Sequence, residues 1–392
     1  MLERKKFHIA IVAGEVSGDL LGAGLIRELK HYPYDFSFSG VAGPQMQEQG
    51  CVSLFPMEAL TLMGLDGLFR RLREILQMRR KLAQYIVADP PDLFVGVDAP
   101  DFNLGLEKKL RRAGIPVLHY VSPTVWAWRK YRLRSMQHCI DRILVLFPFE
   151  LRLYRQHHIR ATLVGHPMVR DIDQHPDIPT LKNKLGISSS KKVIALLPGS
   201  RREEIRHMAI DFVQAAEKLA DKYPHLQFVT AMPNASLLEA FDAELKKSGV
   251  KSLDLLCLTG NSREVMACAD ILMLASGTAA LEAAIVGRPV VVAYKVSWLT
   301  KTMVQLLARV KYFSMPNNLA GYRLVPELMQ DDCTPENLVR EVSVYLDDEA
   351  EVSRVKKAFR EIRDSLDLDS DRLAAEAVIE MLGIDTKMVT KQ

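Results

Sequence analysis

Short apolar runs that each end in a polar or glycine-rich turn recur along the first half of this chain, and helical patterns separate them. The runs are residues 7–13, 92–97, 117–121 and 143–147. The helical patterns cover about 19–31, 70–88, 102–113 and 150–157. Continuous apolar runs of this length are typical of strands buried on both faces of a sheet. Because strands and helices alternate, the sequence predicts a doubly wound parallel sheet.

The second half repeats this organisation after a break. Residues 171–191 are poor in core residues and rich in Pro, Asp, His, Lys and Ser, which predicts a linker around a short helix. Further strands are expected near 193–197, 226–231, 253–257, 271–274 and 289–294, with helices such as 203–222 and 277–286. The 392 residues are therefore expected to form two Rossmann-like α/β domains, 1–175 and 176–344, facing each other across a cleft, and the tail 335–383 is expected to be helical.

Composition and charge exclude several classes of protein. With 48% hydrophobic and 26% charged residues, the chain is neither collagen-like nor disordered. Its five cysteines include no C-x-x-C pair, so we expect no zinc site and the reduced thiols of a cytosolic protein. No apolar run reaches the roughly 18 residues of a spanning helix, and no signal region precedes the first strand. The net charge of +4 is too small to indicate nucleic acid, although the 24 basic and 18 acidic residues of 1–175 suit an anionic surface or a phosphorylated substrate.

Ligands of parallel sheets bind beyond the carboxyl ends of the strands, so the strand-end loops are where polar residues carry function. Neither G-x-G-x-x-G nor G-x-x-x-x-G-K-[ST] occurs. Asp-x-Asp pairs, which can hold a metal-bound diphosphate, occur at 171–173, 367–369 and 369–371. Because these pairs lie in the linker and in the charged tail, we expect neither a metal nor a cofactor.

Two loops of the second domain are candidates for one diphosphate site. Ser276, Gly277 and Thr278 open a helix whose free N–H groups suit an anion, and Glu282, one turn in, suits a ribose diol. The alternative is that the Ser and Thr only cap a core helix. The other loop is Gly199-Ser200-Arg201, in which glycine allows close approach and Arg201 can bind a phosphate oxygen, unless it is a surface residue paired with Glu203 or Glu204.

The first domain contains carboxylates suited to proton transfer. Asp98 directly follows a predicted strand and is the candidate general base, whereas Asp101 is better placed to cap the next helix. Glu15, Ser17 and Asp19 lie in the first strand-end turn. One of these three residues is expected to cap a helix. His166 is a weaker candidate for a base or a phosphate contact, since a lone histidine is often structural. The candidate catalytic residues are therefore Asp98, Glu15 and His166, and Ser17 is a candidate substrate contact.

A basic and apolar stretch of the first domain resembles an interfacial membrane anchor. Its apolar members are Leu60, Leu62, Met63, Leu65, Leu68 and Phe69, and its basic members are Arg70, Arg71, Arg73, Arg79, Arg80 and Lys81. The alternative is that the apolar residues belong to the core. A second such stretch, with Trp126 and Trp128 beside a basic run, suits a sugar or a lipid headgroup as well as core packing.

Together, these residues closely resemble the lipid-A-disaccharide synthase family. The matching blocks, in family order, are 13–19, 40–46, 97–103, 120–129, 147–150, 165–167, 196–201, 276–282 and 316–321. Asn317, in the last block, is counted as a further substrate contact. Two small departures, Val16 where many members have Ala and Thr124 where many have Ser, remove no group that chemistry needs.

The resemblance implies a GT-B-type, inverting, metal-independent glycosyltransferase that joins UDP-2,3-diacylglucosamine to 2,3-diacylglucosamine 1-phosphate (lipid X). The products are a β-1,6-linked disaccharide, a precursor of lipopolysaccharide, and UDP. In this scheme Asp98 is the base, while Arg201 and the helix start at 276–278 stabilise the diphosphate. The resemblance also implies that the helices of 345–385 return to the first domain, that a homodimer is possible, and that the enzyme acts at the inner face of the cytoplasmic membrane.

Two other functions fit the same fold. A non-hydrolysing UDP-N-acetylglucosamine epimerase would share the UDP site but have little use for the basic apolar stretch. A catalytically silent, membrane-associated binding protein would keep both features but need no Asp98.

Overall fold

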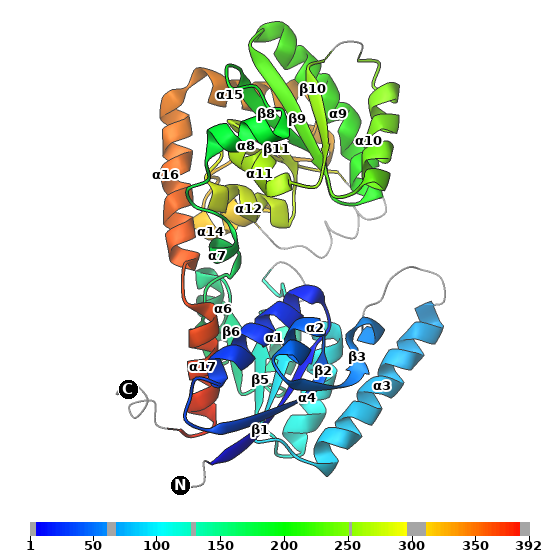
Figure 1. The fold of residues 1–392 in the computed structure, drawn as a ribbon, viewed down its shortest axis with the longest axis vertical. Helices are drawn as coiled ribbons and strands as arrows, with labels where there is room; N and C mark the ends of the chain where they lie inside the picture. The colour runs from blue at the N-terminus through cyan, green and yellow to red at the C-terminus, as the bar shows by residue number, and fades with distance from the viewer. Residues whose placement is uncertain (1–4, 61–67, 127–130, 251–252, 296–310, 385–392) are drawn as a thin grey trace. The chain divides into compact units, whose positions relative to one another are not determined.

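The computed structural model describes residues 5–60, 68–126, 131–250, 253–295 and 311–384, and at 68–72 only the backbone. The chain divides into two compact α/β units (Figure 1). Unit 1 contains the described residues up to His166 and those from Leu368 onward, and unit 2 contains Pro167–Asp367. The division expected at 175/176 therefore falls at 166/167, and of the stretch 345–385 only the part from Leu368 joins unit 1.

Unit 1 is built on a parallel sheet whose described strands have the order β3-β2-β1-β4-β5-β6-β7. These strands are β1 (Lys6–Ala13), β2 (Asp35–Ala42), β3 (Cys51–Pro56), β4 (Leu93–Val97), β5 (Val117–Tyr120), β6 (Arg142–Val145) and β7 (Ala161–Leu163). The central strands β1, β4, β5 and β6 are the four predicted apolar runs. Strand order reverses between β1 and β4, and a ligand crevice forms at such a switch point in open α/β sheets.

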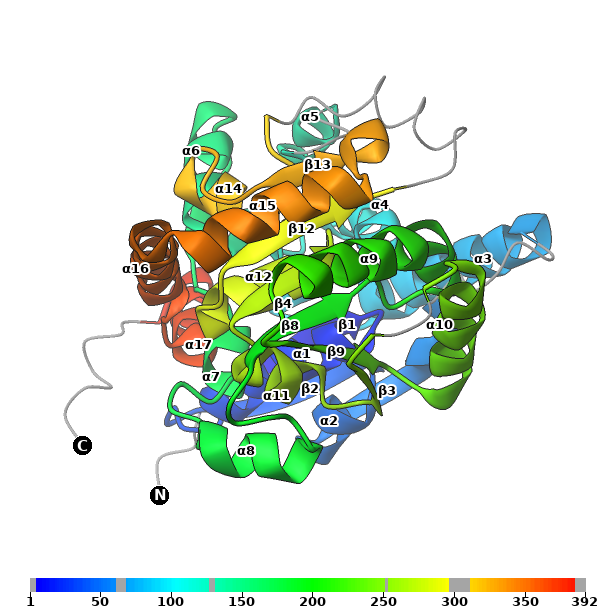
Figure 2. The ribbon, with the colours of Figure 1, turned by 90° about the horizontal axis from the view of Figure 1, so that it is seen from above.

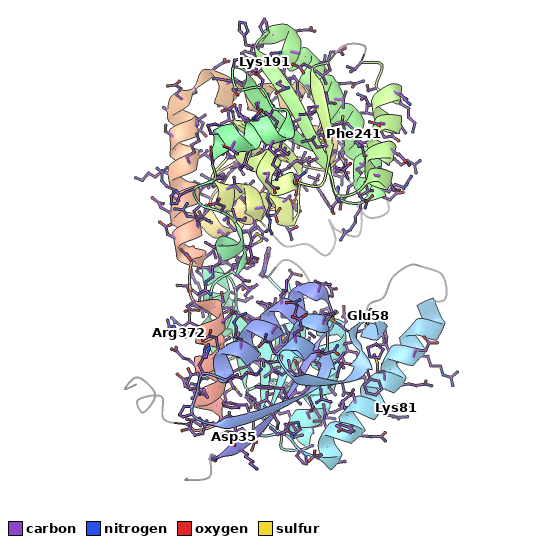
Figure 3. All side chains as sticks on the ribbon, in the orientation of Figure 1. Asp35, Glu58, Lys81, Lys191, Phe241 and Arg372 are labelled. Atoms are coloured by element: carbon purple, nitrogen blue, oxygen red, sulfur yellow. The ribbon has the colours of Figure 1, made fainter. Side chains whose placement is uncertain are left out.

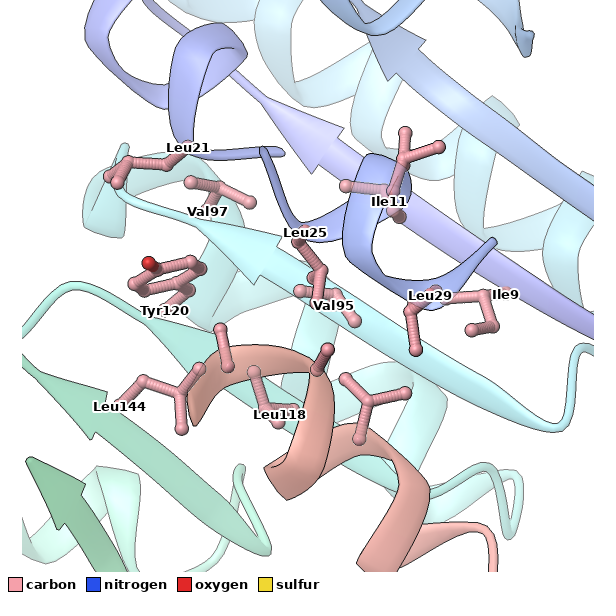
Figure 4. Close-up of a cluster of buried hydrophobic side chains, with 14 of the residues drawn as sticks. Ile9, Ile11, Leu21, Leu25, Leu29, Val95, Val97, Leu118, Tyr120 and Leu144 are labelled. Atoms are coloured by element: carbon pink, nitrogen blue, oxygen red, sulfur yellow. The ribbon is translucent and has the colours of Figure 1, made fainter. Parts of the chain in front are cut away.

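Helices cover both faces of this sheet. They are α1 (Val16–Leu29), α2 (Pro44–Glu48), α3 (Leu68–Ala88), α4 (Pro100–Arg112), α5 (Arg132–Met136), α6 (Pro148–Gln156) and α17 (Ser370–Met381), with a 3-10 turn η1 (Met57–Leu60). Alternate strand residues point to opposite faces, so one core contains side chains of α1 and α17, and the other contains those of α3 and α4. Figure 4 shows Leu25 of α1 on the same face as Leu118 and Leu144, where α17 packs.

Unit 2 is built on a second parallel sheet, in which the described strands have the order β10-β9-β8-β11-β12-β13. They are β8 (Lys192–Leu197), β9 (Leu226–Met232), β10 (Leu255–Thr259), β11 (Ile271–Ala275), β12 (Val290–Tyr294) and β13 (Glu327–Met329). The order reverses between β8 and β11. Each unit therefore has a switch point next to its first strand.

The helices of unit 2 include the predicted short helix of the linker. They are α7 (Met168–Asp171), α8 (Ile178–Leu185), α9 (Arg202–Lys222), α10 (Ala235–Lys247), α11 (Ser262–Cys268), α12 (Thr278–Val286), α14 (Met315–Ala320), α15 (Pro335–Asp347) and α16 (Glu349–Leu366), with a 3-10 turn η2 (Gln330–Asp332). α15 packs on α9, and α16 packs on α12 (Figure 2). α15 and α16 belong to unit 2, so within 345–385 it is α16 that departs from the expected place in the first domain, whereas α17 lies in unit 1.

Candidate functional site

Asp98 stands in a strained turn at the switch point of unit 1. Asp98 and Ala99 both have left-handed backbone conformations, with φ of 50° and 42°. For residues other than glycine this costs about 1–2 kcal/mol each. The turn is held because the Asp98 N–H donates to the Tyr120 carbonyl and Asn103 Nδ2 donates to the Asp98 carbonyl, each at 2.8 Å. The carboxylate itself is half-buried and makes no hydrogen bond or salt bridge within the described part of the chain.

The first strand-end turn lies against the Asp98 turn. A Cβ atom added to Gly14 would lie 2.7 Å from Ala99 Cβ, so the two turns touch. The exposed side chains of Glu15 and Ser17 therefore stand at the same edge of the sheet as Asp98. Asp19 is buried and has a structural role, because it accepts hydrogen bonds from the first backbone N–H groups of the α2 region.

The two other candidates of unit 1 are Asp101 and His166. Asp101 forms a salt bridge with Arg132, and α4 begins after Ala99 without a side-chain cap, so Asp101 does not cap α4 as expected. His166 follows β7, which β5 and β6 separate from β4, a distance of about 14 Å at the usual strand spacing. Its ring is 5.5 Å from that of Phe147, and burial lowers the pKa of His166 to about 4. The structure thus places His166 away from the Asp98 turn with a neutral imidazole, and its role as a base or phosphate contact stays a prediction.

The switch point of unit 2 is a cavity of about 380 Å³ that brings both predicted loops together. Its lining includes Gly199, Ser200, Arg201, Ser276, Gly277, Thr278 and Glu282. α12 begins at Thr278, and no side chain caps its N-terminal end. Ser276 Oγ instead donates to the Phe313 carbonyl at 3.5 Å. The first N–H groups of α12 are thus not used by a side-chain cap, which favours anion binding over the alternative of simple capping.

The 199–201 loop is shaped by Glu204. The Glu204 carboxylate accepts hydrogen bonds from the N–H groups of Ser200 (2.8 Å) and Arg201 (3.2 Å). Gly199 has a φ of 139°, and a Cβ there would lie 2.4 Å from Glu204 Cβ, so only glycine fits. The Arg201 side chain is 82% exposed and 3.4 Å from Glu204, which is the surface pairing that the sequence left open. An exposed pair contributes only about 0–1 kcal/mol, so Arg201 can exchange Glu204 for a diphosphate at little cost.

Glu282 is oriented by a residue that sequence reasoning missed. Arg263 Nε lies 3.1 Å from Glu282 Oε1 and leaves the other carboxylate oxygen of Glu282 for a ligand. Arg263 follows the turn Gly260-Asn261-Ser262 after β10, which has the same pattern as the other strand ends. That turn was the sequence signal that could have identified Arg263.

Asn317 is a structural residue, which corrects its assignment as a substrate contact. It is fully buried. Its amide donates to the Val325 carbonyl and to Glu327, and its oxygen accepts from the N–H groups of Leu324 and Val325. All four hydrogen-bonding positions of the side chain are filled, so none remains for a ligand.

The described part of the basic apolar stretch contains both buried and exposed residues. Leu60 is buried in the core that includes α3 and α4, because η1 turns it toward the sheet, so it is not part of an exposed apolar patch. Leu62, Met63 and Leu65 lie outside the described residues, as do the side chains of Leu68, Phe69, Arg70 and Arg71. Farther along α3, Arg73, Arg80 and Lys81 are exposed, as Figure 3 shows for Lys81, and Leu76 is 44% exposed.

Neither a metal cluster nor a spanning segment is found in the described ranges. No group of three or more His, Cys, Asp or Glu there could hold a metal ion. Of the Asp-x-Asp residues, Asp369 caps α17 and Asp371 forms a salt bridge with Arg27. No described helix has the length and apolar character needed to cross a membrane.

Comparison with known families gives a full-length match. The family model described as lipid-A-disaccharide synthetase matches residues 9–381. A lipid-A-disaccharide synthase from Aeromonas hydrophila subsp. hydrophila is 46% identical over 377 residues, which cover 96% of this chain and 98% of that protein.

Solved structures share the fold at low identity. The UDP-GlcNAc 2-epimerase from Neisseria meningitidis bound to UDP-GlcNAc has a TM-score of 0.59 at 11% identity, covering 96% of this chain and 99% of that one. The calicheamicin glycosyltransferase CalG4 has a TM-score of 0.56 at 14% identity, covering 98% and 99%. The two-sheet architecture is therefore that of GT-B glycosyltransferases and of the related epimerases.

Proposed function

The chain belongs to the lipid-A-disaccharide synthase family, and from that premise we propose that it joins UDP-2,3-diacylglucosamine to lipid X, giving the β-1,6-linked disaccharide 1-phosphate and UDP. The observation that carries the proposal is the pair of switch-point sites. One presents a carboxylate that makes no hydrogen bond or salt bridge with the described residues, and the other is a cavity with an uncapped helix start and an arginine. These are the two kinds of group that sugar transfer from a nucleotide diphosphate requires.

Asp98 is the proposed general base in unit 1. Inversion at the anomeric carbon takes a single displacement, in which the acceptor 6-hydroxyl oxygen forms the new bond while the bond to the UDP oxygen breaks. The hydroxyl proton passes to the Asp98 carboxylate, and the electron pair leaves with UDP. Half-burial and the absence of a competing described partner leave this carboxylate available to the hydroxyl. In the neighbouring turn, Glu15 is proposed as a further catalytic residue and Ser17 as a substrate contact.

The cavity of unit 2 is the proposed donor site. The charge that develops on the departing diphosphate is stabilised by the Arg201 guanidinium and by the first N–H groups of α12, near Ser276 and Thr278. Glu282, held by Arg263, binds the ribose diol. These contacts supply positive charge and N–H donors, so the proposed reaction is metal-independent, and turnover should persist in EDTA.

The membrane surface is the proposed location of the substrates. Both carry acyl chains, and on α3 the exposed Arg73, Arg80 and Lys81 accompany the partly exposed Leu76. An apolar side chain among basic ones suits an anionic bilayer surface. The part of the stretch that precedes α3 is proposed to contribute as well. A homodimer remains a proposal from the family resemblance.

A direct assay tests the proposed function. The protein is incubated with UDP-2,3-diacylglucosamine and lipid X in the presence of EDTA, and the products are identified by mass spectrometry. We expect UDP and the disaccharide 1-phosphate in equal amounts, with both substrates required. An epimerised donor, or binding without turnover, would contradict the proposal.

A further inference from the structure

A pair of ionisable side chains lies buried beneath the Asp98 turn and is not used by the mechanism above. Glu107 of α4 and His119 of β5 are both fully buried, and His119 Nδ1 lies 2.5 Å from Glu107 Oε1. Removing such groups from water is costly, and apolar residues of similar volume often serve stability as well or better. The pair therefore calls for a role besides packing.

The pair is packed directly against β4, just before Asp98. Gly96 stands opposite His119 in the β4–β5 register. A Cβ added to Gly96 would lie 2.2 Å from Glu107 Oε1 and 3.3 Å from Asn103 Cγ. Glycine at position 96 thus makes room for two polar groups of α4 at the strand that leads into the catalytic turn.

Asn103 connects this polar group to the turn itself. Its Nδ2 donates to the Asp98 carbonyl at 2.8 Å and is 3.3 Å from the carbonyls of Val12 and Val97. Glu107 is one helical turn further on the same face of α4. α4 is therefore fastened at two successive points, to the ends of β1 and β4 through Asn103 and to β5 through Glu107.

The Asp98 carboxylate influences the pKa of His119. Burial alone would lower the pKa of His119, but the Glu107 carboxylate and, more weakly, Asp98 raise it above its ordinary value. The charged groups acting on His119 are thus Glu107 from α4 and Asp98 from the β4 turn. The Val121 backbone also raises the pKa of His119 through a hydrogen bond, whereas Glu107 Oε2 is buried without a hydrogen-bond partner in the described chain, and natural proteins rarely keep such a group for packing alone.

We propose that Glu107 and His119 are positioning residues for Asp98, fixing α4 against β4 and β5 so that the left-handed turn presents its carboxylate to the acceptor. This inference rests on the proposed role of Asp98. It requires that the pair influence turnover through Asp98 and not donor binding in unit 2.

A mutant cycle tests the inference. Glu107→Gln removes the charge but keeps the shape, and Glu107→Met with His119→Phe replaces the pair by apolar residues that preserve the fold. Both are made in the wild type and in Asp98→Asn. Tyr154→Phe, which removes the buried hydrogen bond to Ser122 in the same unit, is the matched control. Disaccharide formation, KM, UDP affinity and melting temperature are measured for each.

We expect the pair variants to lower kcat on the order of 10²-fold in the wild type, with UDP affinity unchanged. In Asp98→Asn they should change kcat by less than about threefold, since residues acting as a unit are not additive. Equal losses of kcat in both backgrounds, or a loss of the same size in Tyr154→Phe, would overturn this inference. Either result would leave the assignment of Asp98 as the base intact. An Asp98→Asn protein with wild-type turnover would instead overturn the base assignment on which it rests.

Discussion

The two switch points occupy the same place in sheets whose first six described strands follow the same order, yet they are built in opposite ways. In unit 1, Asp98 and Ala99 adopt left-handed conformations, and the buried Asn103 side chain stabilises them by a hydrogen bond to the Asp98 carbonyl. In unit 2, Gly199 makes the turn, and the exposed Arg201 pairs with the half-buried Glu204. A buried, strained support suits one side chain that must stay fixed, whereas a glycine turn and exchangeable ion pairs suit a ligand that must enter and leave.

The free energies of backbone strain and of hydrogen bonding in the Asp98 turn support this comparison. Two left-handed residues cost about 2–4 kcal/mol together. The hydrogen bonds that hold the turn, one from the Asp98 N–H and those of Asn103, each contribute about 0.5–1.5 kcal/mol net. The two effects are of similar size, so the Asp98 turn depends on these few bonds.

The largest expected effect breaks the chemistry assigned to unit 1. Asp98→Asn keeps the shape of the side chain but removes the proton acceptor, so turnover should fall by about 10²–10⁴-fold. UDP affinity, measured by calorimetry, should remain that of the wild type because UDP binds in unit 2. A variant that keeps more than about a tenth of the wild-type rate would show that Asp98 is not the base.

A second change tests whether buried support also exists in unit 2. Asn317→Ala leaves the buried N–H groups of Leu324 and Val325 without their acceptor, so unfolding should become easier by on the order of 3 kcal/mol. Thermal unfolding measures this loss, with Asn183→Ala on the exposed side of α8 as the control. UDP affinity well below the melting temperature should not change. A folded, stable Asn317→Ala protein with weakened UDP binding would restore Asn317 as a substrate contact.

Two further changes separate the contacts within the donor cavity. Arg201→Ala loses a charge-assisted phosphate contact and Glu282→Ala a ribose contact, each worth about 1.5–3 kcal/mol of UDP affinity. Calorimetric titration with uridine tells them apart, since only Glu282→Ala should weaken uridine. If both variants lose the same affinity for uridine, the assignment of these two residues is wrong.

The smallest expected effect concerns α3. Arg73→Ala with Arg80→Ala should weaken sedimentation with anionic vesicles by about 2 kcal/mol at low salt and by less at high salt. The matched control is Lys184→Ala with Lys192→Ala, two exposed basic residues of unit 2. Equal losses in both double variants would indicate a general charge effect and no specific membrane surface on α3.

The sequence predicted the centre of each sheet better than its edges. The runs that became β1, β4, β8 and β11 are almost entirely apolar because helices cover both faces. β2, in contrast, alternates polar and apolar residues at its start, and β7 and β13 have only three residues each, so none of these gave a continuous apolar signal.

The candidate site was predicted where function depends on a strand-end loop and missed where it depends on packing. Asp98 and Arg201 stand at strand ends, which a sequence pattern reveals. Asn317 has the same polar character but is enclosed, and burial cannot be read from a motif. The Glu107–His119 pair joins residues of a helix and a strand through the fold, so neither position stands out locally.

The central claim is that unit 1 performs the transfer while unit 2 holds the donor, and single-turnover rates at saturating donor test it most directly. Asp98→Asn and Glu282→Ala are compared with the wild type by rapid quench, after their UDP affinities have been measured. We predict that Asp98→Asn binds UDP normally yet stays slow at every donor concentration, whereas Glu282→Ala binds weakly but recovers near wild-type rates at saturation. Recovery of Asp98→Asn at high donor, or a persistent defect of Glu282→Ala at saturation, would contradict it.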